Sequence, residues 1–451
     1  MQKQPENKMG VMPVGRLLFS MSVPMMISML VQALYNVVDS IFVSRVSENA
    51  LTALSMAFPL QNLMIAIASG LGVGVNAILS RALGAREEKQ VNRAATNGIF
   101  MVIVCAVAFM VLGILLPKPF FNMQTDISEI IDAGSSYTSI VMVGCFGLFM
   151  QVLFERLLQS TGRTMFSMAS QATGAILNII LDPIMIFGLA GFPKMGVAGA
   201  ALATVIGQWC AACLGLLMNI KKNPEVSISM KGFRPHGETM KRILVIGVPS
   251  VVMMSIGSVM TFLLNQILMA FSATAVAVFG VYFRLQSFVF MPIFGLNNGS
   301  IPIVAYNYGA KRPDRMKQSI RYTMISAITI MVVGFLIFQI FPKALLELFD
   351  ASEDMIRIGV PALRIISFSF PVAGFCIAVG SVFQALGYSL YTMINSLIRQ
   401  LIVLIPCAFL LSRLTGNINS VWLSFVIAEV SSLIVTLFFY RKIQKEVIDK
   451  L

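Results

Sequence analysis

Apolar stretches long enough to cross a lipid bilayer recur along almost the whole chain. A spanning helix needs about 20 mostly apolar residues, and the 451 residues contain twelve such stretches: 17–43, 50–80, 91–117, 128–158, 164–190, 195–220, 240–271, 273–306, 316–345, 354–385, 389–412 and 419–440. Because the apolar residues are continuous and do not alternate with polar ones, they predict helices and not the strands of a barrel. Only 12% of the residues are charged. The sequence therefore predicts an all-α polytopic membrane protein.

Lysine and arginine gather in alternate connections between these stretches, whereas the opposite connections carry only Arg45, Lys118, Lys194, Lys343 and Arg413. Such asymmetry predicts both termini in the cytoplasm. The first apolar stretch is too long for a cleavable signal, so we expect it to remain as the first span. Attraction to anionic membrane lipids accounts for the net charge of +13, and we expect no nucleic-acid partner.

The second half of the chain repeats residues of the first half at a constant spacing in the sequence. Pro24 and Pro249 form one such pair. Further pairs at the same spacing are Gln61 with Gln286, Gly70 with Gly295, Gly74 with Gly299, and Gly84 with Gly309. Each half has six spans, so both halves enter the membrane from the same side and the repeat is parallel. We expect two pseudo-two-fold-related six-helix lobes around a central cavity, 1–220 and 243–451, joined by a cytoplasmic linker at 221–242.

Two carboxylates lie inside apolar stretches of the first half. Asp182 follows Asn178 by one helical turn and directly precedes Pro183. A charged side chain in the middle of a span costs roughly 2.5–3.5 kcal/mol on insertion scales, so it normally faces a wet or protein-lined cavity. Pro183 is expected to kink the helix and free carbonyl groups for an ion. The alternative is an Asp that bonds a neighbouring helix for packing alone.

The second carboxylate, Asp39, belongs to a polar stripe on the first span, which also contains Gln32, Tyr35 and Asn36 at helical spacing. The repeat equivalents of Asp39 and Asp182 are Leu264 and Cys407, which favours an ion site in the first lobe. The alternating direction of the spans places both carboxylates in the outer half of the bilayer. Tyr137 and Thr204 lie at a similar depth.

These residues predict a site for a proton or a sodium ion. We expect its members to be Asp39, Asn178, Asp182, Thr204 and Tyr137, with Na⁺ contacting Asp39, Asn178 and Asp182. Binding of either cation would neutralise the carboxylate pair. We expect substrate contacts from Met29, Gln32, Tyr35, Asn36, Gln61, Arg284 and Gln286. No other metal or cofactor is expected, since Cys210 and Cys213 lack a second ligand pair.

The second half also carries charges within its spans. Arg284 either forms an ion pair with Glu429 or lines the cavity, where it would meet substrate or a lipid phosphate. Near the end of the fourth span, Glu155 and Arg156 are assigned no transport role. The glycine series Gly70–Gly74 lies inside a span without the Lys-Ser/Thr of a phosphate loop, which favours helix packing.

Several function classes are disfavoured by what the sequence lacks. His236 is the one histidine, and neither H-E-x-x-H nor G-x-S-x-G occurs, so an enzyme is not expected. No phosphate loop supports an ATP-driven pump. A flippase for a lipid-linked oligosaccharide or a peptidoglycan precursor is the alternative to a drug transporter. It would need a more cationic cavity to hold pyrophosphate.

Six segments together resemble the multidrug and toxic compound extrusion (MATE) transporters, in particular the bacterial DinF/MepA-like branch. They are VQALYNVVDSIFV at 31–43, LGARE at 83–87, LNIILDPIMIFG at 177–188, GVAGAALATVIGQ at 196–208, FRLQSF at 283–288 and AYNYGAK at 305–311. The resemblance implies a secondary active antiporter of a prokaryotic plasma membrane that exports cationic or amphipathic drugs in exchange for inward H⁺ or Na⁺. It assigns the cation site to Asp39, Asn178 and Asp182, with Thr204 as a partner. We expect a monomer.

Overall fold

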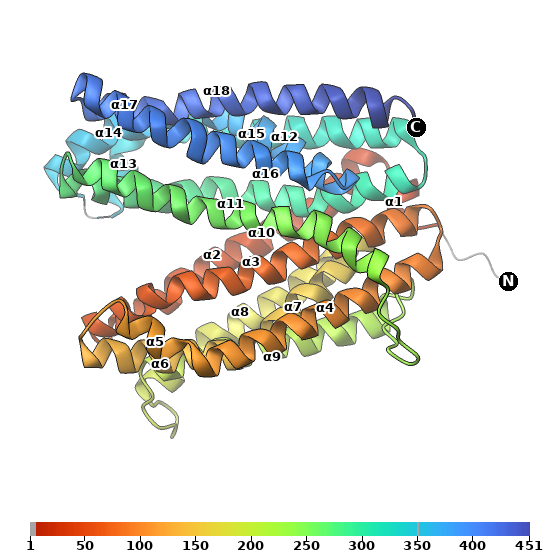
Figure 1. The fold of residues 1–451 in the computed structure, drawn as a ribbon, viewed down its shortest axis with the longest axis horizontal. Helices are drawn as coiled ribbons and strands as arrows, with labels where there is room; N and C mark the ends of the chain where they lie inside the picture. The colour runs from red at the N-terminus through yellow and green to blue at the C-terminus, as the bar shows by residue number, and fades with distance from the viewer. Residues whose placement is uncertain (1–5, 350) are drawn as a thin grey trace.

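The computed structural model describes residues 6–349 and 351–451, and all regular structure in this part of the chain is helical (Figure 1). The first half contains α1 (Lys8–Val11), α2 (Val14–Ser44), α3 (Glu48–Gly84), α4 (Glu88–Leu115), α5 (Pro117–Asn122), α6 (Ser128–Val143), α7 (Phe146–Ser160), α8 (Thr164–Phe187) and α9 (Val197–Lys222). The second half contains α10 (Gly237–Met269), α11 (Ala273–Gly309), α12 (Pro313–Ile340), α13 (Pro342–Glu347), α14 (Glu353–Ser367), α15 (Phe370–Leu386), α16 (Ser389–Leu397), the π-helix η1 (Ile398–Leu404), α17 (Ile405–Thr415), α18 (Ile418–Ile443) and η2 (Gln444–Ile448).

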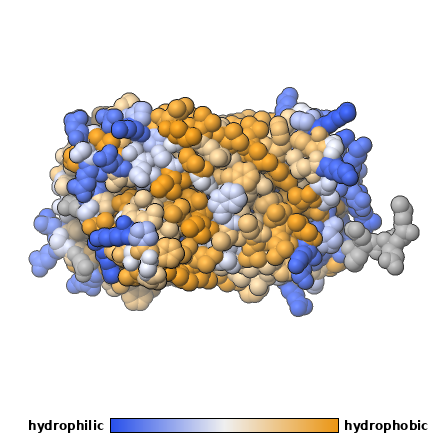
Figure 2. All heavy atoms as spheres, turned by 90° about the horizontal axis from the view of Figure 1, so that it is seen from below, coloured by the Kyte–Doolittle hydropathy of each residue, from blue (hydrophilic) through white to orange (hydrophobic). Residues whose placement is uncertain are grey.

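Ten spans in the described residues are long and apolar enough to cross a membrane, and there are twelve when each of two bent helix pairs is taken as one. These pairs are α6 with α7, bent by 46°, and α14 with α15, bent by 47°. Figure 2 shows the resulting surface, an apolar band between two polar ends. The prediction of a polytopic all-α membrane protein is confirmed. The fourth and tenth spans differ from the expectation only in being broken.

The internal repeat is visible in the helix boundaries. Helices α3, α4 and α5 correspond to α11, α12 and α13. In each pair, the first residues of the two helices are repeat equivalents, and so are the last residues, at the same spacing as Pro24 and Pro249. The six predicted spans of each half therefore fold into two equivalent lobes, which Figure 1 shows as two groups of helices, one red to yellow-green and the other green to blue.

Glycines let the two lobes approach each other closely, and they do so symmetrically. A Cβ atom on Gly84 would lie 2.0 Å from the carbonyl oxygen of Tyr306, and one on Gly309 would lie 2.0 Å from that of Arg81. The repeat exchanges these two contacts, since Gly84 is equivalent to Gly309 and Arg81 to Tyr306. The pseudo-two-fold axis therefore runs between α3 and α11 at this point.

A second pair of symmetric contacts joins α3 to α10 and α11 to α2. Gly70 packs against Val251, and its equivalent Gly295 packs against Met26. The packing interpretation of these glycines is thus confirmed. Gly72 has a different neighbour, since a Cβ atom there would lie 2.8 Å from Cγ of Arg156 on α7.

The lobes interlock because the first helix of each half also packs with the other half. The second lobe's apolar core, formed mainly by residues between 260 and 428, includes Leu17, Leu18 and Met21 of α2. Conversely, Ile243 of α10 belongs to the core of the first lobe. Each of these helices therefore bridges the two lobes near its own N-terminus.

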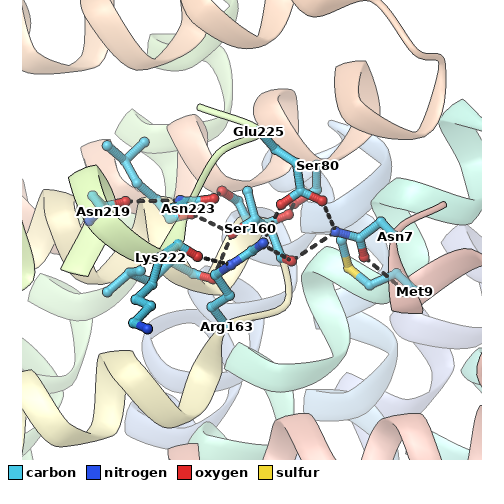
Figure 3. Close-up of polar contacts among 12 residues, drawn as sticks. Asn7, Met9, Ser80, Ser160, Arg163, Asn219, Lys222, Asn223 and Glu225 are labelled. Atoms are coloured by element: carbon cyan, nitrogen blue, oxygen red, sulfur yellow. Dashed lines mark hydrogen bonds and ion pairs between the residues drawn. The ribbon is translucent and has the colours of Figure 1, made fainter. Parts of the chain in front are cut away.

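Helix α1 and the C-terminus lie at one end of the bundle, called here the terminal end, where the lobes are held together (Figure 1). Helix α1 contacts both lobes there. Asn7 donates to the carbonyl of Thr161 at 3.0 Å and to Glu225 at 2.6 Å, and Arg312 of the second lobe donates to the carbonyl of Gly10 at 2.6 Å. Figure 3 shows the first-lobe part of this network, in which Arg163 also bonds Glu225. At the far end, α2 and α3 diverge from α10 and α11 (Figure 1).

Candidate functional site

The first lobe contains a cavity of about 500 Å³, within the usual size range of small-molecule sites. It is surrounded by α2, α3, α6, α7, α8 and α9. Among its lining residues are Met29, Gln32, Tyr35, Asn36, Asp39, Gln61, Tyr137, Gln151, Glu155, Arg156, Gln171, Asn178, Thr204 and Gln208. The polar stripe predicted on the first span thus faces this cavity from α2.

The structure brings the two predicted carboxylates together across α2 and α8. The side chains of Asp39 and Asp182 lie within hydrogen-bonding reach of each other. Asp39 lines the cavity, and Asp182 lies behind it, fully buried. The Oδ1 atom of Asp39 is buried and has no hydrogen-bond partner among the described residues. A buried acceptor without a donor is a place where a proton or a cation would be stabilised.

An amide and a hydroxyl complete this group. Asn178 donates to Oδ1 of Asp182 at 3.4 Å and to Oγ1 of Thr204 at 3.2 Å. With the amide oxygen and nitrogen of Asn178 exchanged, the side chain still donates to Asp182 and accepts from Thr204. These residues lie on α8 and α9, which pack closely where Gly207 meets the carbonyl of Gly174. Carboxylate, amide and hydroxyl oxygens are ligands that hard cations prefer. The group can accept a proton or coordinate a small hard cation such as Na⁺.

The remaining predicted first-lobe residues lie around this group. The hydroxyl of Tyr137 hydrogen-bonds Gln61 and is close to both carboxylates. Gln32 accepts a hydrogen bond from Gln171 at 3.2 Å, which joins α2 to α8. The proline expected to kink the helix does not end it, because α8 continues as an α-helix through Pro183 to Phe187. The proline still lacks the N–H that would bond the carbonyl of Ile179.

Two predicted residues of the second half are not part of this cavity. Gln286 and Arg284 both lie on α11, outside the cavity lining, and Arg284 is exposed. Arg284 lies eleven residues before Gly295 on α11, which corresponds to about three helical turns. It therefore occupies the face of α11 that packs against α2 at Gly295. It therefore projects on the side of α11 from which α2 diverges.

The ion pair expected between Arg284 and Glu429 is wrong. Glu429 is buried and pairs with Arg399, whose Nη1 lies 3.2 Å from Oε2 of the carboxylate. Arg399 belongs to η1, where the backbone hydrogen bonds are one residue wider than in an α-helix. This wider turn changes the direction of the side chain from the one that α-helical periodicity gives.

Sequence reasoning assigned no role to a charged group at the other end of the cavity. Glu155 and Arg156 of α7 both line it and are 7% and 9% exposed. The available signal was the same as for Asp182, a carboxylate within an apolar stretch. Gln151, Gln171 and Gln208 also line the cavity, but uncharged amides in a span carry no comparable signal.

A helical membrane protein built from two repeated lobes, with a polar cavity between its spans, has the architecture of a secondary transporter. The MatE family model matches residues 24–184 and, a second time, residues 249–410. The chain therefore belongs to the MatE family, which is a family of transporters, and the resemblance to MATE proteins is confirmed.

Named relatives and solved structures agree with this assignment. The chain is 27% identical to the multidrug export protein MepA of Staphylococcus aureus (strain MSSA476), over 92% of this chain and 91% of MepA. It is 27% identical to MepA of Staphylococcus haemolyticus (strain JCSC1435), over 90% and 89% of the two chains. A crystal structure of MATE in complex with MaL6 superposes with a TM-score of 0.92 at 25% identity, covering both chains fully. A MOP superfamily transporter from Pyrococcus furiosus, described as having a binding pocket of reversed polarity that suggests a different function, has a TM-score of 0.91 at 25% identity over 98% and 99% of the chains.

Proposed function

We propose that this protein is an antiporter that exports cationic or amphipathic drugs from a prokaryotic cell in exchange for inward H⁺ or Na⁺. The observation that carries this proposal is the contact between Asp39 and Asp182 beside the cavity. The relatives named as multidrug export proteins support the substrate class. The positive-inside pattern supports a cytoplasmic location for the terminal end.

The carboxylate pair supplies a physical basis for exchange. Two carboxylates in contact away from bulk water cannot both be ionised without strong repulsion, so the pair must hold a proton or a cation. When the coupling ion is absent, the negative charge attracts an organic cation into the cavity. When the ion binds, it neutralises this charge and favours a different packing of α2 against α8, from which the drug leaves.

The charge of the cavity favours this proposal over a flippase for lipid-linked sugars. The charged lining residues are Asp39, Glu155 and Arg156, so acidic groups are in excess. The guanidinium of Arg156 is already bonded to Gln159 and Asn298, and Arg399 is paired with Glu429. Pyrophosphate would find no free cationic group among the lining residues that the structure describes.

Transport by the purified protein in liposomes tests the proposal. Liposomes that hold the protein in one orientation are supplied with ethidium. A pH gradient and a Na⁺ gradient are then imposed across the membrane in separate experiments. We expect one of the two gradients to drive ethidium against its concentration gradient and Asp182→Asn to abolish this movement. Movement of a labelled lipid-linked sugar without movement of ethidium, or full transport by Asp182→Asn, would contradict the proposal.

A further inference from the structure

The cavity has a second acidic group at the end opposite to Asp39 and Asp182. Asp182 lies five residues before the end of α8, which runs towards the far end of the bundle. Glu155 lies five residues before the end of α7, which runs in the opposite direction towards the terminal end. The charges of all three carboxylates act on Tyr35, which also lines the cavity.

The Glu155 carboxylate has a neutral hydrogen-bond partner, and the charge of Arg156 acts on it without forming an ion pair. Its Oε1 accepts a hydrogen bond from Gln151 at 3.0 Å, and no ion pair of the described residues includes it. The side chain is 7% exposed and lines the cavity. A carboxylate so buried is strongly stabilised by a positive charge placed beside it.

The neighbouring arginine is engaged elsewhere. Consecutive residues of a helix point about 100° apart, and Nη1 of Arg156 donates to Gln159 at 3.0 Å and to Asn298 of the second lobe at 2.9 Å. The close approach of Gly72 leaves room for this side chain to reach across the lobe interface. Arg156 therefore connects the lobes, and the Glu155 carboxylate remains open to the cavity.

The surface next to Glu155 suits an organic cation. Leu148 and Val152 lie seven and three residues before Glu155 on the same face of α7, and both line the cavity, as do Met64 and Ile65 of α3. An apolar body can pack on these side chains while its positive charge lies against the carboxylate. Small inorganic ions would gain nothing from the apolar part.

We propose that Glu155 binds the positive charge of the exported organic cation, at a subsite separate from the ion-coupling pair Asp39 and Asp182. This inference rests on the proposed function and adds the position of the substrate within the cavity. In this arrangement, the drug and the coupling ion occupy different carboxylates of one cavity and affect each other through the shared electrostatic field.

Two probes that differ by a fixed charge test this subsite. The cation 10-methylacridinium and its neutral parent acridine, at pH 8, are titrated against the purified full-length protein, and binding is followed by fluorescence anisotropy. We expect Glu155→Gln to weaken 10-methylacridinium binding at least tenfold and to change acridine binding by less than twofold. Glu155→Asp should recover most of the affinity for the cation.

The matched control is Glu129→Gln, because it removes the same charge from an acidic residue of α6 that bonds Asn49 and does not line the cavity. It should leave both affinities unchanged. Asp182→Asn should abolish gradient-driven transport, and adding Glu155→Gln to it should still weaken 10-methylacridinium binding further without changing acridine binding.

Each outcome separates the inference from the function on which it rests. Unchanged 10-methylacridinium affinity in Glu155→Gln, with wild-type transport, would overturn the subsite and leave the antiporter intact. Equal weakening of both probes would assign Glu155 a structural role and would also overturn it. A wild-type protein that neither binds the cation nor transports drug would overturn the antiporter and the subsite together.

Discussion

At the scale of single residues, Asn178 connects the carboxylate pair to the neighbouring helix. It bonds both Asp182 and Thr204, so Asn178→Ala should leave two buried polar groups with one partner fewer. The loss of such a bond costs about 1–3 kcal/mol. We expect gradient-driven efflux to fall at least fivefold, as measured in proteoliposomes.

A buried amide of the second lobe provides the control for this prediction. Asn395 bonds Ser432 and Thr436, both at 3.0 Å, and does not line the cavity. Asn395→Ala should lower thermal stability to a similar degree but retain coupled efflux. Equal loss of efflux in both variants would mean that Asn178 acts through stability alone.

The Arg399–Glu429 ion pair gives a second prediction at this scale. Breaking a buried pair from one side costs about 3–5 kcal/mol, because the remaining charge is left unpaired. Arg399→Leu should therefore lower the melting temperature in detergent strongly, and Arg399→Leu with Glu429→Leu should recover most of the loss. Arg284→Leu, at an exposed position, should have little effect. A larger loss from Arg284→Leu than from Arg399→Leu would contradict the observed pairing.

Lys8 gives a prediction that depends on pH. Burial and the nearby charge of Arg163 lower the pKa of the Lys8 ammonium below its ordinary value of 10.5. The folded state thus binds this proton less tightly than the unfolded state, and the penalty fades as pH rises through the folded pKa towards 10.5. Lys8→Met should raise the melting temperature at pH 7, with an advantage that shrinks at alkaline pH. A difference that stays constant from neutral to strongly alkaline pH would show that Lys8 carries no such penalty.

Charge alone did not decide which cavity-lining residues could be predicted, since Glu155 lines the cavity without having been assigned a role and Asn36 lines it as expected. Asp39 and Asp182 could be identified because a carboxylate within an apolar span is rare, and because their repeat equivalents are uncharged. Gln171 and Gln208 could not be identified, since amides occur on many buried helix faces. The partner of Glu429 was missed because the direction of Arg399 depends on a local π-helix.

At the scale of helices, glycine allows α3 and α11 to pack closely at the terminal end. Gly84→Ala would place a methyl group 2.0 Å from a backbone oxygen of α11, which forces α3 and α11 apart. Overpacking of this kind costs typically about 1–3 kcal/mol. We expect a clear fall in the melting temperature, measured in detergent.

Gly280→Ala is the matched substitution for this test. A Cβ atom there meets nothing within 4 Å, and alanine favours a helix over glycine by roughly 0.5–1 kcal/mol. This variant should be as stable as the wild type or more so. If Gly84→Ala behaved like Gly280→Ala, the close packing of α3 on α11 would not hold.

Helix number and order could be predicted from the sequence, but helix shape could not. Apolar run length determines where a chain can span, and this is why the twelve predicted stretches correspond to helices. The bends near Gly144 and Phe368 depend on packing, for example of Gly144 against Val205. The course of α8 through Pro183 likewise depends on neighbours that the sequence does not reveal.

At the scale of the whole molecule, the two repeated lobes share a helix arrangement but differ in the polar residues inside their spans. The boundaries of α3, α4 and α5 repeat in α11, α12 and α13, and the glycine contacts repeat with them. The carboxylates do not, since Leu264 and Cys407 stand at the equivalent positions. The fold is thus symmetric, whereas the polar cavity belongs to the first lobe, and the first helix of each half ties the two together.

The central claim is that Asp39 and Asp182 act as one coupled unit. Gradient-driven ethidium transport by Asp39→Asn, Asp182→Asn and the double variant, each reconstituted at equal amount, tests this claim most directly. Residues that act as a unit have non-additive effects, so the double variant should lose no more activity than either single variant. Substantial transport by one single variant while the other has lost it would contradict the account.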